Sequence, residues 1–146
     1  MDGVDQIDEG LRAIKGGGRA LLREKVVAAS SREYILIADE RKLTSRLGEG
    51  CPLPIEVLPF SLGPVRRKIE SLGSTVAVRM AEAKLGPVIT DNGNFVVDAD
   101  FGFSEDPEYL DVALKAIPGV LETGLFIGYT DTAYIGTAEG VKRLEK

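Results

Sequence analysis

A lysine, a run of glycines and a glutamate near the N-terminus have the types and the spacing of an acid–base site. Lys15 precedes Gly16, Gly17 and Gly18, and Glu24 lies six residues beyond the last glycine. Because glycine has no Cβ and readily adopts positive φ, a backbone of this kind can approach a ligand closely. The residues after the glycines favour a helix, which would direct its first N–H groups at that ligand. The stretch can therefore bind an anionic substrate and use a carboxylate to move a proton.

A plainer interpretation of the same residues stays open. Three glycines before a helix are often only a flexible turn, and Glu24 would then be an ordinary exposed helix residue. Asp2 and Asp5 frame an Asp-Gly-x-Asp turn, which either lies at a ligand-binding sheet edge or belongs to an acidic, solvated tail. Lys42 follows an apolar run, and it is either a phosphate ligand at the end of a strand or a solvated loop lysine.

The composition narrows the chemistry. The chain has 146 residues, enough for one domain or two small lobes that share a core, and 44% of them are hydrophobic. The net charge of −5 gives no basic footprint for nucleic acid. The sequence contains no histidine, so acid–base chemistry falls to Asp, Glu, Lys, Tyr or Cys51, and the commonest metal ligand is missing. We expect neither a metal nor a nucleic-acid partner.

The same composition predicts a location. Cys51 is the single cysteine, which excludes an internal disulfide framework and fits a reducing compartment. No apolar run approaches the length that spans a membrane, and the first residues show no signal-peptide pattern. We expect a cytoplasmic protein without a membrane partner.

Periodicity predicts the elements that position the candidate residues. Residues 19–30 favour a helix, and residues 34–38 form a short apolar run typical of a strand buried on both faces. Residues 48–54 are dense in glycine and proline, which indicates a lobe boundary. The apolar side of the helix is expected to comprise Leu21, Leu22, Val26 and Ala29.

The region after this boundary follows a different order. A helix at 64–72 is closed by Gly73, a second helix is opened by Asp106-Pro107, and residues 91–94 have the sequence of a hairpin turn. Strands are expected at 55–60, 74–81, 95–100 and 125–128. The resulting β-α-β-β-α-β order is the ferredoxin-like pattern. A last strand at 133–136 is followed by a tail at 140–144 that returns toward the first lobe.

Motifs spread along the chain occur in a characteristic order. They are Asp2-Gly3-Val4-Asp5, Lys15-Gly16-Gly17-Gly18, Arg23-Glu24-Lys25, Ile37-Ala38-Asp39-Glu40-Arg41-Lys42, Pro52-Leu53-Pro54-Ile55-Glu56-Val57, Thr90-Asp91-Asn92-Gly93-Asn94 and Ile117-Pro118-Gly119-Val120. In this order they resemble the A-type ribose-5-phosphate isomerases over essentially the whole chain. The resemblance implies an enzyme of the pentose phosphate pathway that interconverts ribose 5-phosphate and ribulose 5-phosphate without a metal or cofactor, and that forms a homodimer or a higher homo-oligomer.

The resemblance also implies a fold and a set of roles. The fold class is α/β, with a partial Rossmann-like parallel-sheet lobe over 1–50 and 129–146 and a ferredoxin-like lobe over 51–128. Glu24 matches the general base, which would move a proton between C2 and C1 through an enediolate. The matching substrate-binding positions are Asp2, Gly3, Val4, Asp5, Lys15, Gly16, Gly17, Gly18 and Lys42.

Two departures from the family pattern leave alternatives open. Gln6 stands where the family usually has Glu, and the family has a large N-terminal segment with a phosphate loop that has no counterpart here. The chain therefore resembles the C-terminal part of the enzyme, and we expect it to be poorly active alone. The alternatives are a non-catalytic sugar-phosphate-binding module, or an inactive fragment that needs an N-terminal partner.

Overall fold

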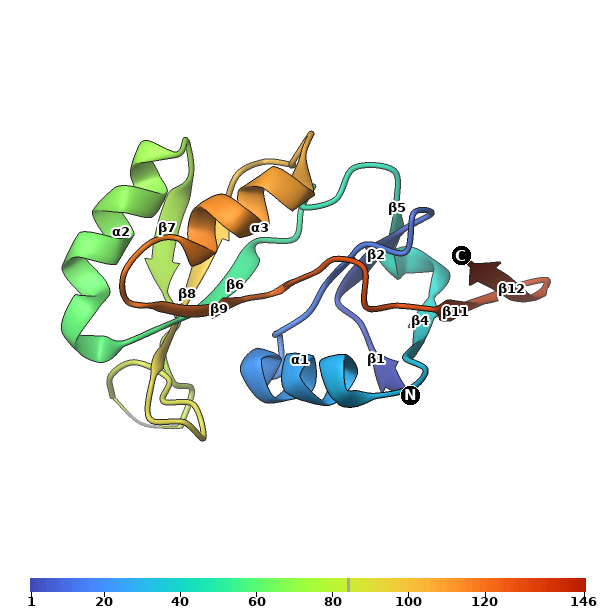
Figure 1. The fold of residues 1–146 in the computed structure, drawn as a ribbon, viewed down its shortest axis with the longest axis horizontal. Helices are drawn as coiled ribbons and strands as arrows, with labels where there is room; N and C mark the ends of the chain where they lie inside the picture. The colour runs from blue at the N-terminus through green and yellow to red at the C-terminus, as the bar shows by residue number, and fades with distance from the viewer. Residues whose placement is uncertain (84) are drawn as a thin grey trace.

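The computed structural model describes residues 1–83 and 85–146, whose strands form three four-stranded sheets (Figure 1). The first sheet consists of β1 (Asp2–Gly3), β4 (Ile35–Asp39), β11 (Thr132–Thr137) and β12 (Gly140–Glu145), in that order. β1, β4 and β11 are parallel, and β12 returns antiparallel to β11. This is the parallel, Rossmann-like part of the predicted α/β fold, and the tail after residue 140 belongs to it as a strand.

Two expectations about this sheet are wrong. The N-terminus is not a solvated tail, because Asp2 pairs in register with Leu36 and the strand at 6–8 is buried. Nor is β4 buried on both faces in the described structure. Leu36 is fully buried, whereas the next residue, Ile37, is 47% exposed. Successive side chains of a strand point to opposite faces, so β4 has one covered face and one open face.

The second sheet is made of short strands that periodicity does not detect. Its order is β10 (Leu125–Phe126), β3 (Ala13–Ile14), β2 (Gln6–Asp8) and β5 (Leu43–Thr44). Strands of two or three residues are too short to show an alternating pattern. They bring the chain before Lys15 next to the chain that follows Thr123.

The third sheet is fully antiparallel and has the order β7-β8-β6-β9. α2 and α3 lie on it together, at the end of the molecule away from β12 (Figure 1). The β-α-β-β-α-β order is the one predicted. The elements are β6 (Leu53–Val57), α2 (Leu62–Ser71), β7 (Thr75–Val78), β8 (Phe95–Asp100), α3 (Pro107–Lys115) and β9 (Val120–Thr123).

Local signals at the ends of these helices behave as predicted. Gly73 has a φ of 98° just after α2, and its N–H donates to the carbonyl of Glu70, as expected for a glycine that ends a helix. Asp106 caps α3 by accepting a hydrogen bond from the N–H of Tyr109, and Pro107 is the first helical residue. The described residues also form two 3-10 turns, η1 (Glu40–Lys42) and η2 (Pro59–Ser61).

The predicted last strand of the ferredoxin-like region is displaced. The strand that joins the third sheet is β9, and the chain then crosses to the second sheet at Gly124. The N–H of Gly124 donates to Pro54, and its carbonyl accepts from the N–H of Lys15. A Cβ on Gly124 would collide with the carbonyl oxygen of Lys15. Only glycine fits between the two chains, so this residue lets the segment leave one sheet for the next.

The buried face of α1 (Leu21–Ser30) is only partly the one predicted, since Leu21 is buried as expected but Val26 and Ala29 are not. Its buried residues are Leu21, Lys25 and Ala28, whereas Val26 is 58% exposed and Ala29 is also exposed. The ion pair described below holds Lys25 inside, and this tertiary contact decides the rotation of the helix. None of the helices among residues 1–83 and 85–146 has the length and apolarity needed to cross a bilayer.

Two hydrophobic clusters support the sheets. The first is formed mainly by residues of the third sheet, α2 and α3, together with Ile14 and Leu47 from the N-terminal part of the chain. The second lies under β4 and β11 around Phe126 and Leu36. The division into 1–50 plus 129–146 and 51–128 remains a proposal, because Ile14 and Leu47 pack in the core of the second region.

Candidate active site

Lys15 is a buried lysine at the centre of the predicted site. It follows β3, its side chain is only 4% exposed, and its Nζ lies 2.9 Å from Oδ2 of Asp2 and 3.4 Å from Oε2 of Glu24. The same ammonium donates to the carbonyl of Gly3 and lies 5.6 Å from the ring centroid of Phe126. A buried charge is stable only when it is paired. The two carboxylates and the carbonyl provide this pairing.

Asp2 has hydrogen-bond donors on both of its carboxylate oxygens. Oδ1 accepts the N–H of Gly3 at 2.8 Å, and Oδ2 accepts the hydroxyl of Tyr34 at 3.0 Å in addition to its contact with Lys15. Burial acts to raise the pKa of Asp2, but Lys15 and Tyr34 outweigh it and hold that pKa below the usual value. Asp2 is therefore a firmly ionised anchor at neutral pH.

Glu24 occupies a contrasting position. It lies in the first turn of α1, and its side chain is 27% exposed. Its Oε2 is buried and, within the described residues, accepts no hydrogen bond. This oxygen beside Lys15 can take a proton without first breaking a hydrogen bond.

The glycine loop is held from both sides. Gly16 adopts a φ of 116°, and Arg19 closes the turn with its N–H on the carbonyl of Gly16 and an unusual φ of 70°. On one side the N–H of Gly17 donates to Oδ2 of Asp5 at 2.7 Å. A Cβ on Gly17 would lie 2.7 Å from the other oxygen of that carboxylate, so glycine is required for this approach.

On the other side the third sheet reaches the loop through Arg79. Its Nη1 donates to the carbonyls of Gly16 at 2.8 Å and Gly17 at 3.3 Å. Its Nε and Nη2 form a bidentate pair with Asp98 on β8. Sequence reasoning did not select Arg79, because an arginine at the end of a strand is ordinary until its partners are known.

The predicted site residues line two adjoining cavities. One, of about 280 Å³, is lined by Asp2, Gly3, Val4, Asp5, Lys15, Gly16, Gly18 and Glu24. The other, of about 570 Å³, is lined by Lys42, Arg41, Cys51, Arg79 and others, together with Asp5 and Gly17. Asp5 is common to both. The structure therefore brings Glu24 together with all the predicted residues except Gly17 and Lys42, which line the adjoining cavity.

The cavity beside Lys42 is also lined by the carboxylate of Glu49 and the thiol of Cys51. Burial raises the pKa of the Cys51 thiol, so it is protonated at neutral pH and is a poor base. Arg41 is engaged with Asp39, its Nε lying 2.7 Å from Oδ1. Lys42 remains as the candidate cation for an anionic group.

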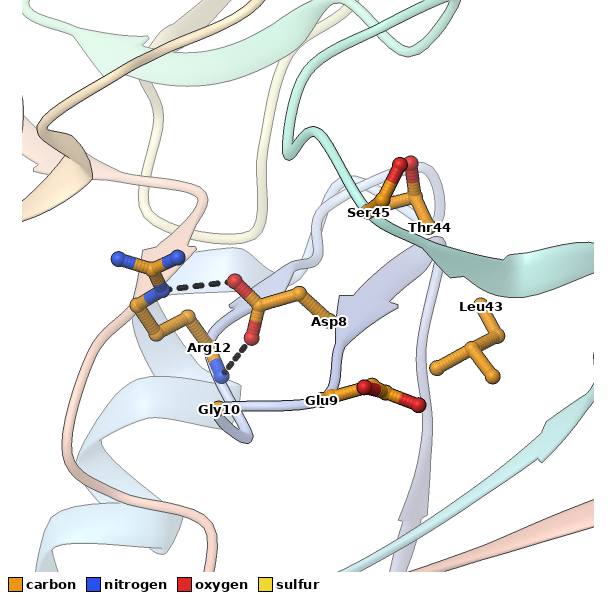
Figure 2. A pocket seen from close by; sticks show the side chains of 7 residues that line it. All are labelled: Asp8, Glu9, Gly10, Arg12, Leu43, Thr44 and Ser45. Atoms are coloured by element: carbon orange, nitrogen blue, oxygen red, sulfur yellow. Dashed lines mark hydrogen bonds and ion pairs between the residues drawn. The ribbon is translucent and has the colours of Figure 1, made fainter.

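A further pocket lies away from these residues, at the turn after β2 (Figure 2). It has a volume of about 530 Å³, and Thr44 and Ser45 are among the residues that line it. Asp8 is bound twice by Arg12, through the backbone N–H at 3.0 Å and Nε at 2.7 Å. This carboxylate is already neutralised, and none of the predicted site residues lines the pocket.

A buried layer supports the site from behind. Nζ of Lys25 donates to Oε1 of Glu122 at 2.8 Å and to the carbonyl of Thr123 at 2.7 Å, and it lies 5.0 Å from the ring centroid of Phe126. Burial lowers the pKa of Lys25, and Glu122 opposes that effect. Phe126 thus has the ammonium groups of Lys25 and Lys15 near the same ring.

The turn at 90–94 is attached to α1. Glu56 is fully buried, and its Oε1 accepts hydrogen bonds from the side chains of Thr90, Asn92 and Asn94. Arg23, the neighbour of Glu24, donates to Oδ1 of Asn92 at 2.9 Å. The hairpin signal of this turn was predicted from sequence, but its attachment to the helix that holds Glu24 was not.

A comparison with protein families identifies the family to which the chain belongs. Residues 1–140 match the family described as ribose 5-phosphate isomerase A (phosphoriboisomerase A). The chain belongs to the ribose 5-phosphate isomerase A family. It is 50% identical over 144 residues to ribose-5-phosphate isomerase A of Methanothermobacter thermautotrophicus and 49% identical to that of Methanosarcina acetivorans. Each alignment covers 99% of this chain, but only 63% and 60% of the relative. The chain spans about three fifths of the length of these ribose 5-phosphate isomerases.

Solved structures of the ribose 5-phosphate isomerase A family agree with the fold. The enzyme from Methanocaldococcus jannaschii matches with a TM-score of 0.95 and 40% identity, over 99% of this chain and 64% of that one. A D-ribose-5-phosphate isomerase in complex with phospho-erythronic acid matches with a TM-score of 0.97 and 42% identity, over 99% and 63%. Among the residues that the structure describes, no group of three or more Cys, Asp or Glu side chains is placed to hold a metal ion.

Proposed function

We propose that this chain provides the base and the sugar-binding residues of an isomerase that interconverts ribose 5-phosphate and ribulose 5-phosphate, in the non-oxidative branch of the pentose phosphate pathway. The main support is the contrast around Lys15. Asp2 accepts hydrogen bonds on both of its carboxylate oxygens, whereas Glu24 presents a buried oxygen that accepts none from the described residues. A base must lie next to its substrate and be able to accept a proton. The position of Glu24 on the wall of the cavity, with this free oxygen, supports its role as the base.

The proposed reaction moves one proton between two carbons and one between two oxygens, and it passes through one stabilised anion. Glu24 removes the proton from C2 of the open-chain aldose, and the electrons of the broken C–H bond pass to the carbonyl oxygen on C1 and give an enediolate. The hydroxyl proton of O2 then passes to O1, and Glu24 returns its proton to C1 as the carbonyl of the ketose forms at C2. Lys15 lies 3.4 Å from Glu24 and can pair with that oxygen, which lowers the barrier where the charge develops. Asp2 and Asp5 hold sugar hydroxyls and assist ring opening.

The phosphate end is proposed to extend toward the adjoining cavity. Asp5 and the glycine loop border both cavities, so one ligand can occupy the two together. Lys42 lines the second cavity and is the proposed phosphate ligand. Phospho-erythronic acid, the molecule bound to one solved relative, is a sugar-acid phosphate and has the combination of groups that the two cavities would accommodate.

A second candidate function is binding without catalysis. The observation that favours it is length, because the chain covers about three fifths of its curated relatives. In this case the chain is a sugar-phosphate-binding module or an inactive fragment that needs an N-terminal partner. We also propose a homodimer or higher homo-oligomer, a cytoplasmic location, and the lobe boundaries given above.

The test compares turnover with binding. Ribose 5-phosphate conversion is assayed with the chain alone and with the chain co-expressed with the N-terminal two fifths of the Methanothermobacter relative, while calorimetry measures ribose 5-phosphate binding. Isomerisation by the chain alone supports the enzyme, and isomerisation only in the co-expressed preparation supports a fragment that needs an N-terminal partner. Binding without turnover in both preparations supports the module, and the absence of both properties would overturn the two functions together.

A further inference from the structure

Two carboxylates share one ammonium in the proposed active site. Nζ of Lys15 lies 2.9 Å from Asp2 and 3.4 Å from Glu24, and its own side chain is 4% exposed. Two carboxylates in one small site disfavour each other's ionisation. The single positive charge of Lys15 cannot neutralise both carboxylates. A further group must therefore determine which of the two is harder to protonate.

Tyr34 provides this asymmetry. Its hydroxyl donates to Oδ2 of Asp2 at 3.0 Å, on the oxygen that also faces Lys15. Tyr34 stands directly before β4, the strand that pairs with β1, so its side chain reaches Asp2 from the neighbouring strand. Glu24, on α1, receives no such hydrogen bond from the described residues on its buried oxygen.

The hydroxyl of Tyr34 is held in place by its surroundings. The residue is 3% exposed, and its ring stacks on Phe126 with an interplanar angle of 22° and a centroid distance of 6.4 Å. Its backbone N–H donates to Oδ2 of Asp131 at 2.8 Å, and its carbonyl accepts the N–H of Asp131 at 2.9 Å. Because the backbone is held by Asp131 and the buried ring is held by Phe126, the hydroxyl donates its hydrogen bond with little entropy still to lose.

We infer that Tyr34 is a positioning residue that keeps Asp2 ionised on Lys15 and thereby leaves Glu24 as the carboxylate that accepts the proton. The inference rests on the proposed function of Glu24 as the base. The sequence gives no sign of this role, since a tyrosine at the start of an apolar strand is an ordinary core residue.

The charges of the cluster agree with this geometry. The groups that face Asp2 are the N–H of Gly3, Lys15 from the end of β3 and Tyr34 from the start of β4, and Glu24 on α1 shares Lys15. The pKa of Asp2 is lowered against the effect of burial. The pKa of Tyr34 is raised by burial and by the adjacent Asp2, so its hydroxyl keeps the proton that it donates.

The test is Tyr34→Phe, which removes only the hydroxyl. Carbon-detected NMR titration of the side-chain carboxyls of Asp2 and Glu24 is carried out on the full chain. We expect the pKa of Asp2 to rise by about one pH unit, because its carboxylate loses a hydrogen-bond donor. Tyr129→Phe is the matched control, since Tyr129 packs edge-on against the same Phe126 ring. It should leave both titrations unchanged.

A second measurement strengthens the hydrogen bond instead of removing it, and it keeps the hydroxyl of Tyr34. Site-specific 3-fluorotyrosine at position 34 makes the hydroxyl a stronger donor and should lower the pKa of Asp2. An unchanged Asp2 titration in both the Phe and the fluorotyrosine proteins would overturn the inference. These titrations need no turnover, so the proposed isomerase can fail its own assay while the role of Tyr34 stands. In an active preparation, Tyr34→Phe should also shift the acidic limb of the kcat/KM profile.

Discussion

Nζ of Lys15 lies 3.4 Å from Oε2 of Glu24, although the two residues come from different elements, the end of β3 and the first turn of α1. The glycine turn between them reverses the chain so that cation and base face one cavity. Proton transfer next to a fixed positive charge is the chemistry that an enediolate intermediate requires.

Replacing the proposed base should abolish turnover and spare binding. Glu24→Gln keeps the size of the side chain but removes the proton acceptor, so kcat should fall by about 10²- to 10⁴-fold in an active preparation. The measurement is steady-state conversion of ribose 5-phosphate, with calorimetry for affinity. Glu33→Gln, at an exposed position outside the cavity, is the control. Near-normal turnover in Glu24→Gln would remove Glu24 from the mechanism.

Removing the central cation should harm both binding and turnover. In Lys15→Ala, the carboxylates of Asp2 and Glu24 lose the ammonium that compensates them, and the enediolate loses its counter-charge. We expect KM to rise and kcat to fall. Lys68→Ala, on the exposed face of α2, provides the comparison. Unchanged kinetics would show that Lys15 is only structural.

The bidentate arginine should matter for rate through the position of the glycine loop. Arg79→Lys keeps the charge but cannot bind Asp98 and the carbonyls of Gly16 and Gly17 at the same time. A small displacement of the loop should lower kcat/KM by roughly 10- to 100-fold. Arg66→Lys replaces an arginine whose ion pair with Glu70 is exposed, and it should have little effect. Equal rates for the two variants would contradict a positioning role for Arg79.

The buried pair behind the site should stabilise the fold only as a pair. Lys25→Met leaves Glu122 paired with the more exposed Lys115, 3.3 Å away, and should lower the free energy of unfolding by about 2 kcal/mol. Lys25→Met combined with Glu122→Gln should recover part of that loss. Urea unfolding measures both. Lys142→Met, which breaks an exposed pair with Glu9, should cost less than about 1 kcal/mol. An equal decrease in the free energy of unfolding in Lys25→Met and Lys142→Met would show that burial does not make the first pair more important.

Acid should destabilise the protein over a defined range. Lys15 and Tyr34 lower the pKa of Asp2 against burial, and Lys25 does the same for Glu122. A carboxylate with a lowered pKa in the folded state contributes stability above its unfolded pKa, near 3.8 for Asp and 4.5 for Glu, and loses it as the pH falls through the folded value. The free energy of unfolding should therefore drop below about pH 4.5. Glu122→Gln should reduce that slope, and an unchanged slope would exclude Glu122 as a contributor.

Local sequence predicted much of the fold. The helices at 62–71 and 107–115 and the strand at 95–100 lie within a few residues of their predicted ranges, because helix caps, prolines and apolar alternation act over short distances. The family motifs predicted Lys15, Glu24 and Asp2, which do meet in one cavity. The last strand of the ferredoxin-like region was misplaced, since two apolar segments flank Gly124 and sequence does not show which sheet each one joins.

The chain alone therefore determined which residue types were available for chemistry and the order of most elements. Tertiary structure decided which of those residues act together. It placed Tyr34 on Asp2, Arg79 on the glycine carbonyls and Lys25 inside rather than on the surface of its helix. Each of these roles depends on a partner from a different element, and Lys25 meets a glutamate 97 residues away. Pairings of this kind arise only when the sheets pack, because the hydrogen bonds and charges involved have no local sequence pattern.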